Sequence, residues 1–300
     1  MQHSIARADM LGTVRMCAWG DVVIHTYISP EDGLLANTQI VEGPNNLIIF
    51  DGQFFLPYAA EAAAYAGGLG KPVERIVLSH VHLDHWSGLP VLSTQFPKAP
   101  IYAPRGVSEY LSAHGQKILD ARRPAFGDRI PLRPTIPTHI LPEGLEEIDG
   151  VRFCFLRFVD AESALQLVAI MPDQRCLLAF DLAFAPNVHV FTVTSHFDNW
   201  VRILEELKTI STFDLVLSGH GEPTDRSALD ATIAYLHAGK ATYATSEEAD
   251  IYASRMKAAF PQRQHSSWID ISASLLYGVI DAYDTRPSQA EVAAEVLARL

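Results

Sequence analysis

Four side chains of types that bind metal ions fall within six consecutive positions of this sequence. The segment SHVHLDHWSG, residues 79–88, contains His80, His82, Asp84 and His85. Imidazole nitrogens and carboxylate oxygens bind divalent cations, and histidines two apart on extended or looped backbone can converge on one ion. The adjacent pair Asp84-His85 points differently from the other two histidines. The spacing therefore predicts two side chains for each of two metal ions, against the alternative of a polar loop with incidental histidines.

The residues that lead into this cluster predict the element that positions it. Residues 75–79, RIVLS, form an apolar run that is typical of a buried strand. Residues 57–69 are alanine-rich with helical apolar spacing, and Gly70-Lys71-Pro72 ends that helix. A strand, a helix and a second strand therefore precede the cluster, as in an α/β unit. Short antiparallel strands are expected before them, among others at residues 21–28, 38–42 and 47–50.

Farther along the chain, apolar runs and helical spacing predict further elements. Strands are expected at residues 151–158, 165–171, 176–180 and 215–218. Helical stretches are expected at 106–114, 115–122 and 200–211, and the pattern is helical from about residue 225 almost to residue 300. Residues 123–142 hold several prolines and are predicted to wrap the surface.

Composition narrows the class of protein. The chain has 300 residues, 48% of them hydrophobic, and a formal net charge of −12. That is ample for a large core, and such an acidic chain is a poor binder of nucleic acid because phosphate contacts need clustered Lys and Arg. Three cysteines without regular spacing do not predict a disulfide framework. The first residues lack an apolar signal core, and no run approaches membrane-spanning length. We expect a soluble cytoplasmic protein with a small-molecule substrate; its oligomeric state stays open.

The motif His-x-His-x-Asp-His after a strand resembles the signature of the metallo-β-lactamase-fold superfamily. The resemblance covers roughly residues 35–225 and includes EGPNNLIIFDG, which is similar to the family's strand ending in an aspartate, here Asp51. It implies an α/β fold, an αββα sandwich with metals at one edge between the two sheets. Residues 1–224 would form this domain, and residues 225–300 a helical C-terminal extension packed on it. The resemblance also implies three further ligands downstream.

Two of those ligands have clear counterparts here. CLLAFDL is an apolar strand that ends in Asp181, which matches the family's bridging carboxylate. The family usually has glycine before that aspartate, whereas this chain has Phe180. LVLSGHG is an apolar strand followed by His220, which matches the last ligand. Taken alone, Asp181 would be interpreted as a helix cap or turn residue. Its position at a strand end, in family order, favours a ligand.

The remaining ligand departs from the family pattern. No histidine lies between His139 and His189, and the family's Gly-His-Thr-x-Gly is absent. Counting back from the Pro172 turn puts Glu162 at the histidine's place, with Asp160 as the second choice. Some branches of the superfamily, such as alkylsulfatases and a diiron β-hydroxylase, are similar in using glutamate there. The alternative is a solvated loop carboxylate, with one metal site weak or lost.

The resemblance thus implies a dinuclear site. One ion would be held by His80, His82 and Glu162, the other by Asp84, His85 and His220, and Asp181 would bridge them. Zinc is the first expectation. A carboxylate in place of an imidazole shifts the preference toward manganese or iron.

The predicted activity is metal-dependent hydrolysis. A metal-bound hydroxide would cleave a small ester, lactone, thioester or phosphoester, while the metal ions polarise the scissile oxygen. Asp84 and Asp181 are the predicted catalytic residues, because a carboxylate oxygen that does not bridge the ions can carry a proton to the leaving group. The alternatives are a diiron oxidase or oxygenase of the same fold, motivated by Glu162, and a non-enzymatic ligand-binding member with a degraded metal site.

Overall fold

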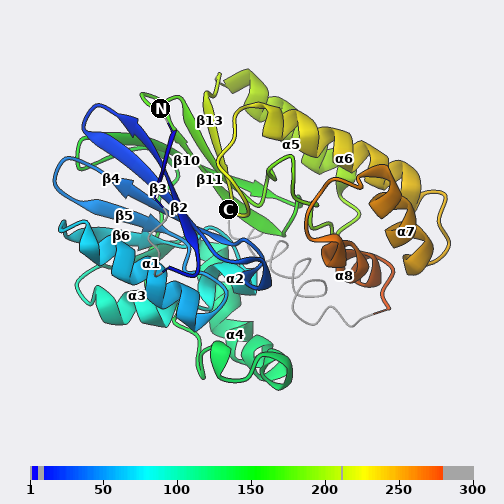
Figure 1. The fold of residues 1–300 in the computed structure, drawn as a ribbon, viewed down its shortest axis with the longest axis horizontal. Coiled ribbons are helices and arrows are strands. Elements are labelled where there is room, and N and C mark those ends of the chain that lie inside the picture. Colours follow the sequence, from blue (N-terminus) through cyan, green and yellow to red (C-terminus); the bar gives the residue numbers. More distant parts are fainter. Residues whose placement is uncertain (1, 6–9, 211, 280–300) are drawn as a thin grey trace. The chain divides into compact units, whose positions relative to one another are not determined.

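The structure is a computed structural model that describes residues 2–5, 10–210 and 212–279. The chain divides into two compact units, here called the first unit (residues 1–157 and 169–174) and the second unit (residues 158–168 and 175–300). The described strands form one eight-stranded and one five-stranded sheet (Figure 1). The predicted boundary at residue 224 stays a prediction, and the predicted helical pattern over residues 280–300 lies outside the described residues.

The eight-stranded sheet follows the order of the chain, β1 to β8. Strands β1 to β5 pair antiparallel, and β5 to β8 pair parallel. The strands are β1 Gln2–Ile5, β2 Thr13–Trp19, β3 Val22–Ile28, β4 Asn37–Glu42, β5 Leu47–Phe50, β6 Val73–Val77, β7 Ile101–Ala103 and β8 His139–Ile140. The strands predicted at 21–28, 38–42 and 47–50 are confirmed, whereas β6 ends two residues before the predicted Ser79. Because parallel strands share one carboxyl edge, the residues after β5 and β6 lie at the same end of this sheet.

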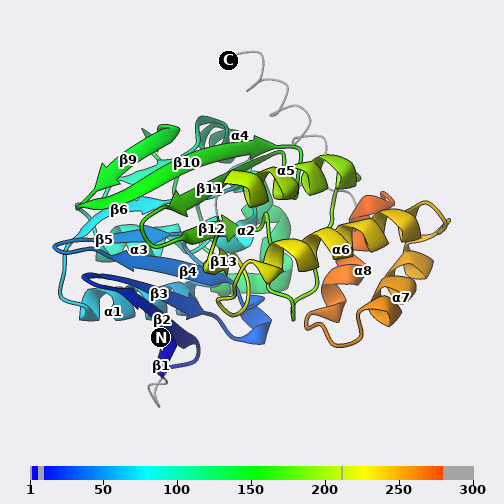
Figure 2. The same ribbon diagram turned by 90° about the horizontal axis from the view of Figure 1, so that it is seen from above.

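The helices of the first unit connect these parallel strands. They are α1 Leu56–Gly68, α2 Leu83–Trp86, α3 Leu89–Gln95 and α4 Arg105–Phe126, with 3-10 turns η1 Glu31–Gly33 and η2 Gly127–Arg129. Helices α1 and α3 lie side by side (Figures 1 and 2). The predicted break between two helices at Gly115 is wrong, because α4 continues through it. A Cβ at that position would lie 3.1 Å from Pro134 Cβ, so the glycine is there for close packing.

The five-stranded sheet has the order β13-β12-β11-β10-β9. Its strands are β9 Gly144–Ile148, β10 Val151–Val159, β11 Leu165–Met171, β12 Cys176–Phe180 and β13 Leu215–Ser218, which confirms the four strands predicted here. Strands β9 and β10 pair antiparallel, and β12 and β13 pair parallel. The carboxyl ends of β12 and β13 therefore lie next to each other.

Among its described residues, the second unit has four helices: α5 Phe197–Ile210, α6 Ser227–Tyr243, α7 Ala249–Ala259 and α8 Ser266–Leu276. Helix α5 packs along α6, and α7 packs along α8 (Figures 1 and 2). Within the described ranges, every helix is too short or too polar to cross a lipid bilayer.

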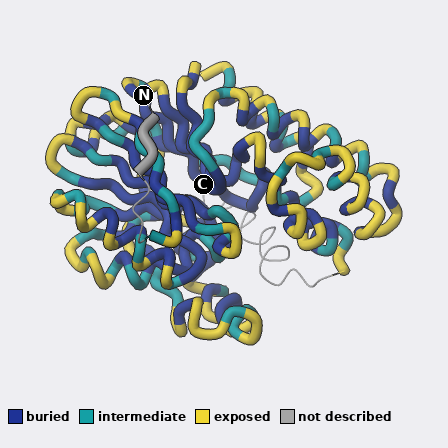
Figure 3. Tube along the Cα trace, in the orientation of Figure 1, coloured by how far each residue is buried: buried dark blue, intermediate teal, exposed yellow. Residues whose placement is uncertain are grey.

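The most completely buried segments of the chain are strands. Every residue of β5, β11, β12 and β13 is buried, while the helices expose one face (Figure 3). Strands that are buried along their whole length are covered on both faces, so the polar residues that follow them emerge at the sheet edges. The buried runs before Asp51, Asp181 and His220 are of this type.

Candidate metal centre

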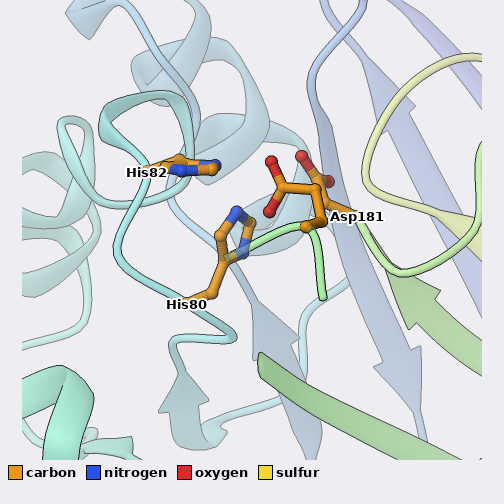
Figure 4. A group of neighbouring side chains, drawn as sticks. His80, His82 and Asp181 are labelled. Carbon is orange, nitrogen blue, oxygen red and sulfur yellow. The ribbon is translucent and has the colours of Figure 1, made fainter. Parts of the chain in front are cut away.

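The histidine segment begins where β6 ends, at the carboxyl edge of the eight-stranded sheet. Figure 4 shows the His80 and His82 side chains on the loop after this strand, and His82 is the N-cap residue of α2. Asp84 and His85 lie inside that short helix. The three histidines are buried, with 0% of His80, 7% of His82 and 0% of His85 exposed.

The fold brings these four predicted ligands together. The ring centroids of His80 and His82 are 4.9 Å apart, and those of His80 and His85 are 4.2 Å apart. One carboxylate oxygen of Asp84 lies 3.6 Å from Nε2 of His85. The first unit therefore contains a compact group of three imidazoles and one carboxylate.

Asp51 and Ser79 determine which nitrogens of this group are available to a metal. Asp51 Oδ2 accepts a hydrogen bond from Ser79 Oγ at 2.7 Å and lies 2.9 Å from His85 Nδ1. Because an ionised carboxylate only accepts, His85 Nδ1 carries the proton and Nε2 keeps its lone pair. Ser79 Oγ also lies 2.9 Å from His80 Nδ1, and its hydrogen goes to Asp51, so His80 Nδ1 is the donor there. Both histidines thus keep the Nε2 lone pair available to a metal ion, an arrangement that outer-shell partners commonly produce in metal sites.

The backbone around Asp51 ties two loops together. Asp51 has φ 63° and Gln53 has φ 75°, both in the left-handed region that few side chains adopt. Gly52 N donates to His85 O at 2.6 Å, and Gly88 N donates to Gln53 O at 3.0 Å. A Cβ on Gly88 would lie 1.8 Å from Gly52 O, so only glycine fits. The loop after β5 is therefore built to support the histidine segment.

The second unit gathers the three remaining predicted ligands. Asp181 follows β12 (Figure 4) and His220 follows β13; both are buried, with Asp181 Oδ2 3.2 Å from His220 Nε2. Glu162, at 0% exposure, offers a ligand atom within 4.8 Å of one from Asp181. Phe180, where the family has glycine, has φ 48°, a left-handed conformation that glycine adopts without strain.

Glu162 and Asp160 differ in their surroundings. Gln166 Nε2 donates to Glu162 Oε2 at 2.8 Å, which orients the buried carboxylate. Asp160 is half-buried and has φ 54°, and its backbone carbonyl accepts a hydrogen bond from Asn199 Nδ2 at 2.8 Å. Its position is that of a turn residue, and within the described residues it belongs to no group of clustered metal-binding side chains. The geometry favours Glu162 over Asp160, and its role as a ligand stays a prediction.

The residues that support the ligands were not predicted as functional. The sequence pattern identifies Asp51 only as the end of a strand and indicates no role for Ser79 or Gln166. The feature of the sequence that could identify these residues is a polar side chain at the end of an apolar strand, or one close in the chain to a predicted ligand. His189, which lies downstream of Asp181, is a packing residue: it is 1% exposed, and burial together with nearby Arg263 lowers its pKa to about 4.

Both groups of side chains fit a metal ion. Glu162 and Asp181 are two buried carboxylates with oxygens close together, and a cation bound there would relieve their mutual repulsion in a low-dielectric interior. In the first unit, Asp51 and Ser79 orient His80 and His85 so that each Nε2 keeps its lone pair. Nitrogen and carboxylate oxygen donors in this mixture suit zinc, manganese or iron.

The sequence matches the profile of the metallo-beta-lactamase superfamily over residues 32–220. The chain belongs to this superfamily, which confirms the predicted recognition. Among solved structures it is similar to a metallo-beta-lactamase from Pontibacter korlensis, with a TM-score of 0.56 and 14% identity, covering 79% of this chain and 99% of that one. It is also similar to the metallo-beta-lactamase FIM-1 from Pseudomonas aeruginosa in its mono-zinc form, with a TM-score of 0.55 and 17% identity over 77% and 97% of the two chains. These structures confirm the predicted fold class.

Two curated relatives carry a more specific description. The alkyl/aryl-sulfatase BDS1 of Saccharomyces cerevisiae is 26% identical over 227 residues, 63% of this chain and 35% of that protein. The linear primary-alkylsulfatase of a Pseudomonas species is 26% identical over 241 residues, 66% and 45% of the two chains. This chain therefore spans less than half the length of either relative. Together with the family match, these descriptions favour the predicted metallo-hydrolase, which stays a prediction for this chain.

Proposed function

We propose that this chain hydrolyses a small ester with two metal ions that the two groups of ligands hold jointly. The observation that carries the proposal is the network of Asp51, Ser79, His80 and His85, which presents two buried Nε2 atoms as ligands. A carboxylate that holds the proton on Nδ1 is a common partner of histidines that bind a metal through Nε2. The match to the superfamily, which spans both groups, supports their joint action.

The ligand assignment follows the sequence prediction. His80, His82 and Glu162 would hold one ion, Asp84, His85 and His220 the other, and Asp181 would bridge them. Metal ions held in this way lower the pKa of a bound water and polarise the scissile group. Zinc is the first candidate; Glu162 makes manganese or iron compatible with the same donor set.

The protein's own residues have separate tasks. Asp51 keeps the proton of His85 on Nδ1 and so keeps Nε2 available. Asp84, with 15% of its side chain exposed, is the more accessible of the two predicted catalytic carboxylates, since Asp181 is 3% exposed. An oxygen of Asp84 that binds no metal can therefore take a proton from water and pass it to the leaving group.

Among ester substrates we propose a sulfate ester first. The support is the description of the two curated relatives as sulfatases, together with Glu162 at the position where the family usually has histidine. A carboxylic ester, lactone, thioester or phosphoester remains in the substrate class that the donor set can serve, because fold and metals are shared by many chemistries.

A panel of p-nitrophenyl sulfate, p-nitrophenyl phosphate, p-nitrophenyl acetate and a small lactone tests the proposal. The assay uses zinc- or manganese-loaded protein without oxygen. We expect turnover of at least one substrate, with a rate that rises with pH as the nucleophilic water ionises. If no substrate of the panel is turned over and an iron-loaded sample consumes oxygen, the hydrolase proposal is wrong. The diiron oxidase, which Glu162 also permits, is then favoured.

A further inference from the structure

The imidazole of His220 lies against two aromatic side chains of the second unit. Phe184 stacks parallel to it, with ring centroids 5.9 Å apart and an interplanar angle of 2°. Trp268 of α8 meets it almost at right angles, with centroids 4.7 Å apart and an angle of 85°. All three side chains are buried. Two large rings in these orientations leave the imidazole little freedom to change rotamer.

Trp268 is held in turn by His265, the residue before the first turn of α8. Their rings stack with centroids 4.9 Å apart and an angle of 18°. His265 has φ 62° and ψ 48°, a left-handed conformation that is uncommon outside glycine. Such a conformation persists only where its surroundings hold it. Here Gln264 N donates to Asn187 O at 2.6 Å, and His189 N donates to Gln264 O at 3.0 Å.

His265 differs from two other buried histidines that are not predicted ligands. His25 lies within hydrogen-bond distance of Tyr65 and Glu42 through its two nitrogens, and His189 lies 3.3 Å from Tyr235 OH. His265 is 6% exposed, and its Nε2 is buried with no hydrogen-bond partner in the described part of the chain. The ring contact that the structure shows for His265 is its stacking on Trp268. The contribution of His265 is therefore to hold the Trp268 ring.

We propose that Trp268 is a positioning residue for the metal ligand His220, so that helix α8 is part of the metal centre. The inference rests on the proposed function in taking His220 as a ligand. Ligand orientation at His85 is set by a hydrogen bond to Asp51 at 2.9 Å. At His220 the rings of Phe184 and Trp268 supply a comparable restraint by packing. This gives the C-terminal helices a task in the chemistry beyond covering the core.

The first test measures metal affinity. Trp268→Leu, Trp268→Phe and wild type are titrated with zinc against a competing chelator, with Tyr252→Leu as control. Tyr252 is a buried aromatic of the same unit on α7, in ring contact with Tyr243 and Tyr277. We expect Trp268→Leu to bind one of the two ions about 10- to 100-fold more weakly, the range for losing an outer-shell partner. Trp268→Phe should recover most of that affinity. Tyr252→Leu should lower thermal stability but leave the zinc affinity unchanged.

The second test needs no metal. Imidazole NMR signals of the metal-free protein are compared, and the His220 resonances are assigned by their loss in His220→Gln. We expect one sharp set in wild type, broadened or doubled signals in Trp268→Leu, and a single set again in Trp268→Phe. Should Trp268→Leu fail to fold, His265→Asn replaces it, because asparagine tolerates the left-handed conformation but removes the stacked ring.

The two tests fail in different ways. A wild-type protein that binds no metal overturns the proposed function, while the His220 signals still decide whether Trp268 positions that ring. Unchanged zinc affinity and a single sharp His220 signal in Trp268→Leu, or in His265→Asn in its place, overturn the positioning role. A loss of affinity in Tyr252→Leu equal to that in Trp268→Leu overturns it as well, because the effect would then be one of general stability.

Discussion

The two groups of predicted ligands are built in different ways. In the first unit His80, His82, Asp84 and His85 come from one short segment of the chain. In the second unit the ligands come from three places in the chain, the turn after β10 and the ends of β12 and β13. The first group is local in sequence and the second is assembled only when the strands pair.

Their supports differ as well. In the histidine segment, His85 donates a hydrogen bond to Asp51 and His80 donates one to Ser79, and these bonds select the tautomer of two imidazoles. In the second unit Gln166 orients Glu162, and His220 is held by the rings of Phe184 and Trp268. The first group should therefore respond most to changes of polarity at constant shape, and the second to changes of side-chain volume.

Removing a ligand from the histidine segment should have the largest effect. His82→Ala deletes an imidazole whose loss leaves one ion with an incomplete set of ligands. We expect the loss of at least one metal ion per chain and about a 100-fold or greater fall in activity. Elemental analysis of protein purified without added metal measures it. His139→Ala, at an exposed histidine of β8, is the control. Unchanged metal content in His82→Ala would remove that residue from the proposed site.

The second largest effect is expected when the Glu162 carboxylate is replaced. Glu162→Gln keeps the shape but removes the charge, and we expect lower occupancy of the ion assigned to His80 and His82. Asp160→Asn is the matched control, because asparagine tolerates the φ of 54° found there. Metal analysis of both variants decides between the two residues. A loss in Asp160→Asn alone would transfer the ligand to Asp160. No loss in either would favour a degraded site.

Replacing a residue that supports the histidine segment should lower metal affinity less than removing a predicted ligand. Asp51→Asn places an amide group where a carboxylate now accepts from both Ser79 and His85. We expect metal affinity to fall about 10- to 100-fold, as for other outer-shell partners, while the fold is kept. Chelator competition measures the affinity, and circular dichroism checks the fold. Ser79→Ala, which leaves the bond of Asp51 to His85 in place, should lose less. Equal affinity in Asp51→Asn and wild type would contradict the tautomer argument.

The smallest expected effect is a difference between two variants at Phe180. Phe180 is 1% exposed and has φ 48°, so removing its ring costs packing while glycine also relieves backbone strain. Phe180→Ala should lower the free energy of unfolding by about 3–5 kcal/mol. Phe180→Gly should be more stable than Phe180→Ala by about 0.5–1 kcal/mol, the reverse of the usual order, because alanine is strained at this φ. Urea denaturation compares them, and alanine proving the more stable would show that the strain is not significant.

Much of the fold was predictable from local pattern. Mostly apolar runs ending at turns predicted β3, β5, β11 and β12 within one residue, because strands that are buried along most of their length are mostly apolar. The break predicted in α4 at Gly115 was wrong, since the glycine is there for contact with Pro134, which is distant in the chain. Local propensity contains no information about such a contact.

The sequence by itself determined the histidine segment, because its ligands are close in the chain and one strand end positions them all. It also indicated Asp181 and His220, through the family order of strand ends. Only the tertiary structure decided which residues support them. The tautomers of His80 and His85 depend on Asp51, which reaches them because β5 and β6 are parallel neighbours. The orientation of His220 depends on Trp268, distant in the chain, and packing contacts between distant residues leave no spacing in a sequence from which they could be predicted.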